Sequence, residues 1–168
     1  GISCREVSVV KEQTLPSEEE REMLVRQYSE LVYRLAFSQV RRRCDAEDIF
    51  QEVFLRYFRA CPRFENEAHR KAWLMRVTVN CAKKYWASAW VRRTVPLEED
   101  VAFEMPEDQL LYEQLQMLPG KYRAVLHLFY YEELSVEEIS RILGQKPSTV
   151  RTQLTRGRRM LKKKLEEE

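Results

Sequence analysis

The chain has 168 residues, of which 44% are hydrophobic, so it is long enough for one domain or two small ones with real apolar cores. Its longest apolar stretch, residues 124–131, is interrupted by His127 and falls far short of the ~20 residues that a membrane span needs, which predicts no membrane insertion. The four cysteines form no Cys-x-x-Cys pair and the two histidines are isolated, which argues against a zinc site and a disulfide framework. We therefore expect a cytoplasmic protein with free thiols, no metal and no cofactor, in which Cys44 and Cys81 fill helix-packing positions.

Helical periodicity dominates the whole chain. Apolar residues recur every three or four positions over long stretches, only four glycines are present, and no alternating strand pattern competes. These features predict an all-α fold of two small helical domains joined by an acidic linker. Residues 1–20 lack a signal-peptide core and are expected to form an N-terminal tail.

Two long helices open the first predicted domain, residues 21–95. The first helix is marked by apolar residues on one face: Leu24, Val25, Tyr28, Leu31, Val32, Leu35 and Val40. The second, DAEDIFQEVFLRYFRA, is expected to be capped by Asp45 and stopped by Pro62, with acidic residues near its start, where the helix dipole favours negative charge. Its broad apolar face consists of Ala46, Ile49, Phe50, Val53, Phe54 and Tyr57.

A loop, RFENEAH, leads into a third helix that is predicted from about Arg70 to Val91. The core side of this helix comprises Trp73, Leu74, Val77, Cys81 and Tyr85. No acidic residue lies between Glu67 and Glu98, whereas seven basic residues do. This imbalance predicts a surface that faces DNA.

The charge reverses in residues 96–110, which contain six acidic residues, two prolines and no basic residue. DNA would repel such a segment, and its apolar residues follow no helical period, so we expect a linker. A second predicted domain, residues 111–168, follows it.

The stretch from Leu134 to Leu165 has the pattern of a helix-turn-helix. Ser135 and Glu138 form the S-x-x-E capping box that opens a helix, and Gly144 supplies the left-handed residue that ends it. The apolar stripe of this helix is Val136, Ile139, Ile142 and Leu143. Pro147 suits the first turn of a second helix, where its missing amide is tolerated. The apolar face of that second helix is Val150, Leu154, Leu161 and Leu165.

Positive charge gathers on this motif. Nine Lys or Arg residues and no Asp or Glu lie between Arg141 and Leu165, although the whole chain carries a formal charge of only +2. A charge run alone is usually a solvated helix face. Here a capped first helix, a glycine turn and polar side chains at the start of the second helix accompany it, which favours DNA as the partner.

Three segments together resemble a known family. DAEDIFQEVFLRYF, KAWLMRVTVNCAKKY and, after the linker, LPGKYRAVLHLFYYEELSVEEISRILGQKPSTVRTQLTRGRRMLKKKL are similar to extracytoplasmic-function (ECF) sigma factors of the sigma-70 superfamily. The resemblance runs from about Tyr28 to Leu165 and includes two separate motifs in the expected order. It implies a region 2 module and a region 4 module without a region 3 domain between them. It also implies a non-catalytic initiation subunit that binds core RNA polymerase and promoter DNA.

The resemblance also implies roles for individual residues. Core RNA polymerase is expected to contact the second helix through Asp45, Asp48, Gln51, Glu52 and Leu55. The single-stranded minus-10 promoter element is expected to contact Phe64, Asn66, Glu67, Arg76, Asn80, Lys83 and Lys84. The minus-35 duplex is expected to contact Lys146, Ser148, Thr149, Arg151, Thr152, Thr155, Arg156 and Arg159, of which Ser148 and Thr149 would also cap the helix. Helix capping by Asp45 and Glu47, and a helix–helix hydrogen bond from Asn80, are open alternatives.

Two other classes of protein explain less of the sequence. A dimeric helix-turn-helix regulator would explain the C-terminal half, but it needs neither DAEDIFQEVF nor the acidic linker. An enzyme needs a clustered site, and the sequence has no phosphate-cradling glycine loop and no nucleophile paired with a base. Small relatives of the resembled family are commonly held inactive by an anti-sigma factor, so such a partner is also an expectation.

Overall fold

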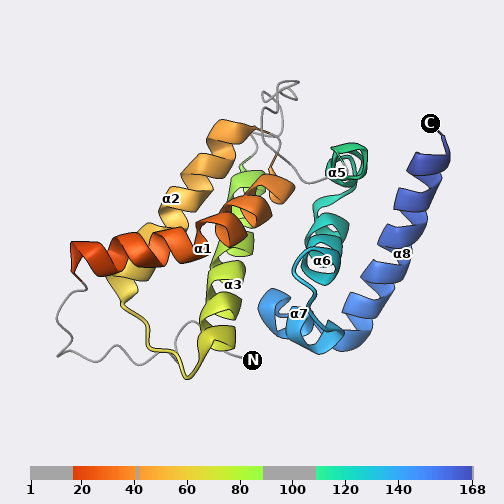
Figure 1. Ribbon diagram of the computed structural model, residues 1–168. Helices are drawn as coiled ribbons and strands as arrows, with labels where there is room; N and C mark the ends of the chain where they lie inside the picture. Colours follow the sequence, from red (N-terminus) through yellow and green to blue (C-terminus); the bar gives the residue numbers. More distant parts are fainter. Residues whose placement is uncertain (1–16, 41, 89–108, 168) are drawn as a thin grey trace.

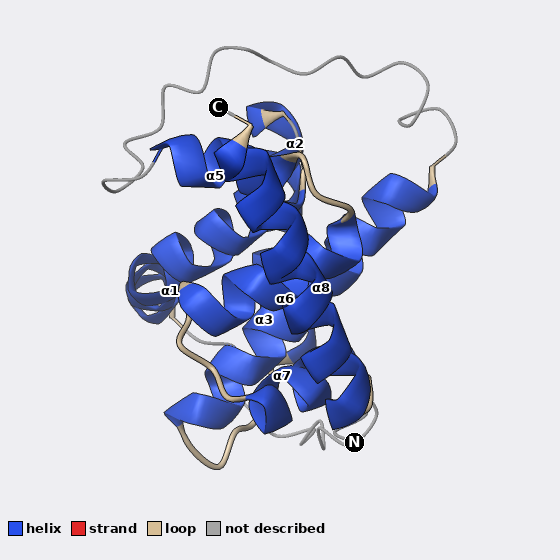
Figure 2. Ribbon diagram, turned by 90° about the vertical axis from the view of Figure 1, so that its right-hand side faces the viewer, coloured by secondary structure: helices blue, strands red, loops and turns tan. Residues whose placement is uncertain are grey.

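A computed structural model describes residues 17–40, 42–88 and 109–167, and within these ranges the chain forms helices and loops with no strand (Figures 1 and 2). The predicted all-α class is therefore confirmed. The N-terminal module comprises α1 (Glu18–Gln39), α2 (Arg43–Ala60) and α3 (Glu67–Ala87). The C-terminal module comprises α5 (Gln109–Gln116), α6 (Gly120–Tyr130), α7 (Val136–Leu143) and α8 (Pro147–Glu166). Among the described helices, none has the length and apolar content to cross a membrane.

Helix α1 begins inside the segment that was expected to be a tail. The Ser17 hydroxyl accepts a hydrogen bond from the Glu20 amide at 3.2 Å, and three glutamates occupy the first turn, where they complement the helix dipole. The tail prediction is thus wrong for residues 17–20, while residues 1–16 lie outside the described residues. So do residues 96–108 of the predicted linker, and Gln109 already belongs to α5.

The start of α2 differs from the expectation. Arg42 is the N-cap and its side chain makes no capping hydrogen bond, so the prediction that Asp45 caps the helix is wrong. Asp45 lies within the first turn, because helical backbone begins at Arg43. Its carboxylate accepts a hydrogen bond from the Tyr85 hydroxyl at 2.7 Å, which joins α2 to α3.

Helix α3 begins three residues earlier than predicted. Asn66 is its N-cap, and the Asn66 side chain accepts a hydrogen bond from the His69 amide at 2.9 Å. The described helix ends at Ala87, and Val91, the predicted end, lies outside the described residues. Asn66 followed by Glu67 is a helix-start signal in the sequence, and it lies upstream of Arg70, where the helix was predicted to begin.

The three N-terminal helices pack around one apolar core, as their periodicity predicted. The buried residues of this core are Tyr28, Val32, Ala36, Phe37, Val40, Ala46, Ile49, Val53, Phe54, Leu74, Val77, Cys81 and Ala82. Cys81 therefore fills a packing position, but Cys44 is exposed at the start of α2, so its predicted packing role is wrong.

The helix-turn-helix is formed by α7 and α8. Ser135 and Glu138 make the predicted capping box, and Gly144 ends α7 with a φ of 64°, a left-handed conformation that favours glycine. Val150 and Leu154 are buried as predicted, but Leu165 is 39% exposed, so its predicted place on the buried face is wrong.

Gly157 also lies on the buried side of α8, although it was not among the apolar residues predicted for that side. A Cβ atom on this residue would lie 3.1 Å from Cδ1 of Leu126, so α8 approaches α6 more closely than a larger residue would allow. An isolated glycine at a helical packing position is a sequence signal of such close approach.

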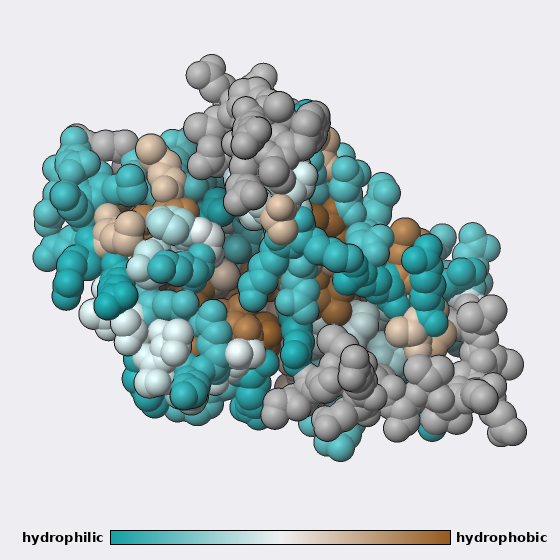
Figure 3. Space-filling model, turned by 180° about the vertical axis from the view of Figure 1, so that it is seen from behind, coloured by the Kyte–Doolittle hydropathy of each residue, from teal (hydrophilic) through white to brown (hydrophobic). Residues whose placement is uncertain are grey.

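The two modules pack against each other through a shared apolar core. Leu35 of α1 and Met75 and Val79 of α3 join the buried residues of the C-terminal module, which include Val125, Leu126, Leu128, Ile139, Ile142, Val150 and Leu154. In Figure 1, α6 and α7 lie beside α1 and α3, with α8 on the outside. Seen from behind, hydrophilic side chains cover most of the described surface, and hydrophobic ones show mainly in the crevices between them (Figure 3).

Polar contacts also cross this inter-module interface. The Gln116 side-chain amide donates a hydrogen bond to the Phe37 carbonyl at 3.2 Å, and the Arg123 guanidinium lies 5.6 Å from the centre of the Trp86 ring. Arg123 is buried, and its guanidinium also donates to the Gln116 carbonyl at 3.3 Å. The interface therefore combines apolar packing with buried polar groups.

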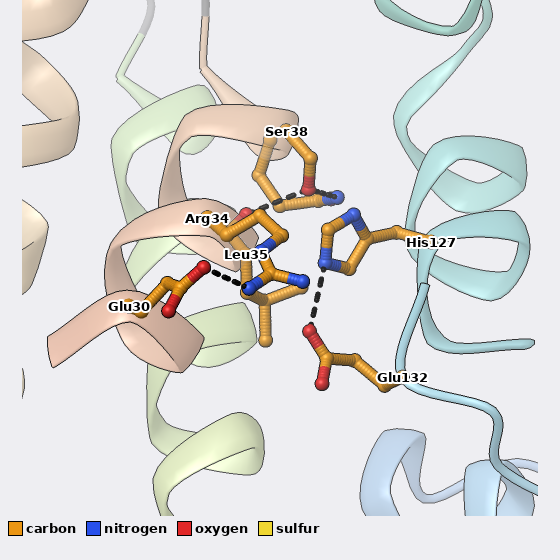
Figure 4. A network of polar contacts seen from close by, with 7 residues as sticks. Glu30, Arg34, Leu35, Ser38, His127 and Glu132 are labelled. Atoms are coloured by element: carbon orange, nitrogen blue, oxygen red, sulfur yellow. Dashed lines mark hydrogen bonds and ion pairs between the residues drawn. The ribbon is translucent and has the colours of Figure 1, made fainter. Parts of the chain in front are cut away.

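His127 is the most deeply placed titratable group of the interface, at 2% exposure. Its Nε2 atom lies 3.5 Å from a carboxylate oxygen of Glu132, and its ring stacks on Tyr131. Figure 4 shows Arg34 and Ser38 of α1 beside the imidazole, with Arg34 paired to Glu30 at 2.7 Å. A carboxylate five positions later and a helix of the other module thus meet His127, although sequence spacing indicated neither contact.

Burial lowers the pKa of His127 below its ordinary value, and the nearby Arg34 charge acts in the same direction, while the Glu132 carboxylate opposes them. The folded protein thus holds a neutral imidazole, whereas the unfolded chain takes up a proton as the pH falls through about 6.5. Stability that is present above this pH is lost below it, because the unfolded state then binds the extra proton.

We predict that the free energy of unfolding decreases between pH 7 and pH 5.5, by at most about 1.4 kcal/mol per pH unit from this one group. Urea unfolding at several pH values measures the effect. His127→Gln should remove this contribution, while His69→Gln, at the only other histidine of the chain, should retain it. An unchanged slope in His127→Gln would show that other groups cause the pH dependence.

Candidate nucleic-acid interface

The residues expected to contact polymerase form a stripe along α2. Asp48, Gln51, Glu52 and Leu55 are three or four positions apart, so they share one side of the helix, opposite the buried Ile49 and Val53. Asp48 and Gln51 are exposed, Glu52 is half-buried, and Leu55 is 46% exposed, which is unusual for a leucine of the N-terminal module.

Two of the five α2 residues expected to contact polymerase already have partners. Glu52 accepts from Arg56 at 2.9 Å, and this hydrogen bond is the main reason that the pKa of Glu52 lies below its ordinary value. Asp45, the fifth predicted residue, is held by Tyr85 and lies 4.0 Å from Arg42. Asp48 and Gln51 are therefore the members best placed to make new polar contacts.

Phe64, in the loop before α3, lies among aromatic side chains of α2 and α3. Its ring is 6.0 Å from Tyr57, 6.1 Å from Trp73 and 5.2 Å from His69, measured between ring centroids. The Arg70 guanidinium lies 5.6 Å from the Phe64 ring centre. The ring is half-buried, so packing accounts for much of its surface and only its remaining face is open to a stacking partner.

The polar residues of the same loop are engaged locally. Asn66 uses its side-chain oxygen to cap α3, and Glu67 pairs with Arg70 at 2.6 Å. Both residues are nevertheless exposed. A nucleic acid that contacts them would have to use the atoms these bonds leave open, or exchange the bonds.

The basic residues of α3 share a second stripe. Arg76, Asn80, Lys83 and Lys84 recur at helical spacing, and the last three are exposed. The Lys84 charge contributes to the lowered pKa of Glu52, so the α3 stripe adjoins the α2 stripe. Lys83 and Lys121 also line a cleft of about 650 Å³ between the modules.

Helix α8 presents the remaining predicted residues. Its buried side, Val150, Leu154 and Gly157, packs into the C-terminal module, and the predicted contact residues all lie exposed: Lys146, Ser148, Thr149, Arg151, Thr152, Thr155, Arg156 and Arg159. The structure thus brings this whole set together on the solvent side of one helix.

Hydrogen bonds within α8 determine which polar groups of these residues remain available to a partner. The N-cap is Lys146, without a side-chain capping bond, so the prediction that Ser148 and Thr149 cap the helix is wrong. Pro147 begins the helix and leaves them inside its first turn, where helical amides lack intrahelical acceptors. The hydroxyls of Thr152 and Thr155 bond to backbone carbonyls one turn earlier, at 3.0 Å each.

Sequence reasoning missed one residue on this face. Glu137 of α7 lies 3.5 Å from the Arg151 guanidinium, measured between Oε1 and Nη2. Arg158, which the sequence offers as a phosphate contact, donates to the Tyr130 hydroxyl and lies 5.1 Å from the Phe129 ring centre, so its guanidinium already has partners in α6. The signal for Glu137 was its place in an otherwise basic motif, but its pairing depends on how α7 crosses α8.

Metal chemistry has no candidate in the described part of the chain. No group of three or more His, Cys, Asp or Glu side chains there is arranged to hold a metal ion. The exposed stripes instead offer guanidinium, ammonium, amide and carboxylate groups, which suit hydrogen bonding and charge pairing with macromolecules.

Comparison with known proteins identifies both modules. The Sigma-70 region 2 family profile matches residues 24–92, and the Sigma-70 region 4 profile matches residues 108–161. The ECF RNA polymerase sigma factor SigW of Bacillus subtilis is 31% identical over 158 residues, which cover 82% of this chain and 84% of SigW. The ECF RNA polymerase sigma factor SigE of Mycolicibacterium smegmatis is 36% identical over 83% of this chain, which spans 59% of that relative.

Solved structures share the fold. The sigma factor RpoE, in a co-crystal structure with the anti-sigma factor NepR from Bartonella quintana, matches with a TM-score of 0.70 at 20% identity, over 86% of this chain and 96% of that one. CnrH, in complex with the cytosolic domain of CnrY, matches with a TM-score of 0.66 at 19% identity, over 90% and 91%.

We predict that Asp45 and Asp48 respond differently to substitution. Asp45→Ala should lower the free energy of unfolding by about 1–2 kcal/mol, because it removes the half-buried partner of Tyr85. Asp48→Ala should stay within about 0.5 kcal/mol of the parent, because Asp48 is exposed. Urea unfolding of both variants measures this, and equal losses would contradict a structural role particular to Asp45.

Proposed function

Because the chain belongs to the ECF RNA polymerase sigma factor family, we propose that it binds core RNA polymerase and directs promoter recognition, melting and transcription initiation. The observation that carries this proposal is the presence of both sigma-70 modules in one chain, in the order region 2 then region 4. A stand-alone helix-turn-helix regulator is not favoured, because it would leave the match to region 2 over residues 24–92 unexplained.

We propose that the modules divide the work at the boundaries read from the sequence, with residues 21–95 acting as region 2 and residues 111–168 as region 4. The α2 stripe, with its open carboxylate, amide and exposed leucine, is the proposed contact for core polymerase. Its support is chemical, since an exposed apolar side chain flanked by polar groups is what a protein partner covers.

The loop before α3 and the α3 stripe are the proposed contacts for the minus-10 strand. An unstacked base needs a flat partner and groups for its edge, and the Phe64 cluster with Asn66, Glu67 and Asn80 offers both kinds of group. Lys83 and Lys84 would hold the phosphates, which positions the strand without specifying its sequence.

Helix α8 is the proposed reader of the minus-35 duplex. Arg151 and Arg156 can each grip a guanine in bidentate fashion. The bonded hydroxyls of Thr152 and Thr155 leave their methyl groups for apolar contact with thymine. The amides of Ser148 and Thr149, together with Lys146, are suited to a phosphate.

The proposed setting is the bacterial cytoplasm, and an anti-sigma factor is a proposed second partner. The complex of RpoE with NepR supports this partner by analogy of fold alone. No enzymatic step belongs to the chain in this proposal, since bond formation is carried out by the polymerase.

The test is reconstitution. Purified protein is mixed with bacterial core RNA polymerase, applied to a sizing column, and assayed for transcription from a promoter library. Comigration and initiation from a defined set of promoters are expected. Tight duplex binding by the free protein, without association with polymerase, would overturn the proposal in favour of a repressor.

We predict that Asp48→Ala weakens binding to core polymerase by roughly tenfold, because it removes an exposed polar contact at the centre of the α2 stripe. Fluorescence anisotropy with labelled protein measures the affinity. Glu22→Ala, an exposed carboxylate on α1, is the matched control and should bind as the parent does. Parent-like binding by Asp48→Ala would remove Asp48 from the proposed interface.

We predict that Arg156→Ala lowers discrimination between the preferred minus-35 element and a scrambled duplex by roughly tenfold, because a bidentate base contact is lost. Holoenzyme binding to both duplexes, at fixed salt, measures this ratio. Lys163→Ala removes an exposed charge farther along the same helix and should weaken both duplexes equally. Equal loss in Arg156→Ala would reassign Arg156 to phosphate contact.

A further inference from the structure

The helix-turn-helix contains an ion pair that its packing does not require. Oε1 of Glu137 lies 3.5 Å from Nη2 of Arg151, and the two side chains are 63% and 61% exposed. A pair with so much solvent around it contributes little to stability, because water screens the charges. Its consequence is therefore geometric: the carboxylate restricts where the Arg151 guanidinium lies.

Glu137 is the acidic side chain of α7 that is available for this task. Its neighbour Glu138 is occupied by the capping box, where it accepts hydrogen bonds from the amide and hydroxyl of Ser135. Between Leu134 and Leu165 the sequence has no other acidic residue. One carboxylate thus faces α8 within a strongly basic motif.

For simple attraction to DNA, a carboxylate at this place is unfavourable, because it repels the phosphates that the surrounding Lys and Arg side chains attract. A position that opposes general binding can still favour selective binding. Fixing one edge of a guanidinium leaves its other N–H groups to point in one direction, which lowers the side-chain entropy lost when it grips a base.

Among the proposed base-reading arginines, Arg151 is the one held in this way. Within the described residues, Arg156 and Arg159 show no ion pair with a carboxylate. The structure therefore separates one oriented arginine from others on the same helix that extend into solvent.

We propose that Glu137 is a specificity-determining residue, which orients the Arg151 guanidinium toward guanine in the upstream promoter duplex. This inference rests on the proposed function, because it assigns a role within DNA recognition by α8. Glu137 is a positioning residue in this scheme: it acts on the DNA through Arg151.

The test uses reconstituted holoenzyme and a duplex library randomised across the upstream element, with sequencing of the bound fraction. For Glu137→Gln we expect the preference for guanine at one position to fall by roughly two- to fivefold, the scale of an exposed ion pair. Affinity for random duplex should rise slightly, because one negative charge is removed. The midpoint of thermal unfolding should stay unchanged, since both side chains are exposed.

Two further variants isolate the mechanism. Glu133→Gln removes one exposed negative charge from the loop before α7 and should leave base preference unchanged. In the background of Arg151→Ala, Glu137→Gln should cause no further loss of base preference, because the group it orients is absent.

The possible outcomes distinguish a failure of the role of Glu137 from a failure of the proposed function. A parent holoenzyme that enriches no upstream element would overturn the proposed function, and the role of Glu137 with it. A defined element with identical base preferences in parent and Glu137→Gln would overturn the role of Glu137 alone. Loss of preference by Glu137→Gln that persists without Arg151 would overturn the positioning of Arg151.

Discussion

The double use of helix α1 is the constraint on which the arrangement of the structure depends. One side of the helix, with Tyr28, Val32 and Ala36, packs into the N-terminal core, while Leu35 belongs to the core of the C-terminal module. A single rigid helix therefore fixes the two modules relative to each other. Because α3 contributes Met75 and Val79 to the same shared core, rotation about α1 would expose apolar surface on a second helix.

This packing leaves the proposed contact stripes on the outside. The apolar sides of α2, α3 and α8 are turned inward, and Asp48, Asn80 and Arg156 stand exposed on the opposite sides. Residues that hold the fold and residues proposed to bind partners are thus largely different sets. Asp45 belongs to both, because the carboxylate expected to meet polymerase is also the acceptor for Tyr85. The inter-module interface itself holds His127 and Arg123, and burying such polar groups costs free energy unless each finds a partner.

Sequence patterns predicted most of what depends on neighbouring residues. Helical periodicity located α1, α2, α3, α7 and α8 with their apolar sides, and the Ser135 capping box and Gly144 were readable because their partners lie within one turn. The errors concern contacts between distant segments or competing local signals. Asp45 has the residue type of a helix cap, but its partner, Tyr85, is 40 residues away, and no local pattern indicates that hydrogen bond. The pairing of His127 with Glu132 and the packing of the two modules against each other depend on how helices cross, which periodicity does not determine. For the candidate site, helical spacing predicted which residues share a helix side, but it did not indicate that Asp45, Glu52, Phe64 and Arg76 are partly buried while the other predicted residues are exposed.

Local bonding also decides which part of a residue can read DNA. A threonine hydroxyl that bonds to the preceding turn of its own helix satisfies its donor at no cost in new contacts. The methyl group is then the part able to gain from a partner, and its preference is for thymine. Nη2 of Arg151 lies beside a carboxylate from another helix, which leaves the other N–H groups of the guanidinium available to a partner. From sequence alone, every donor and acceptor of a threonine or an arginine counts as available for a contact. The structure narrows each to a subset, and in the proposed function base preference follows from the subset that remains.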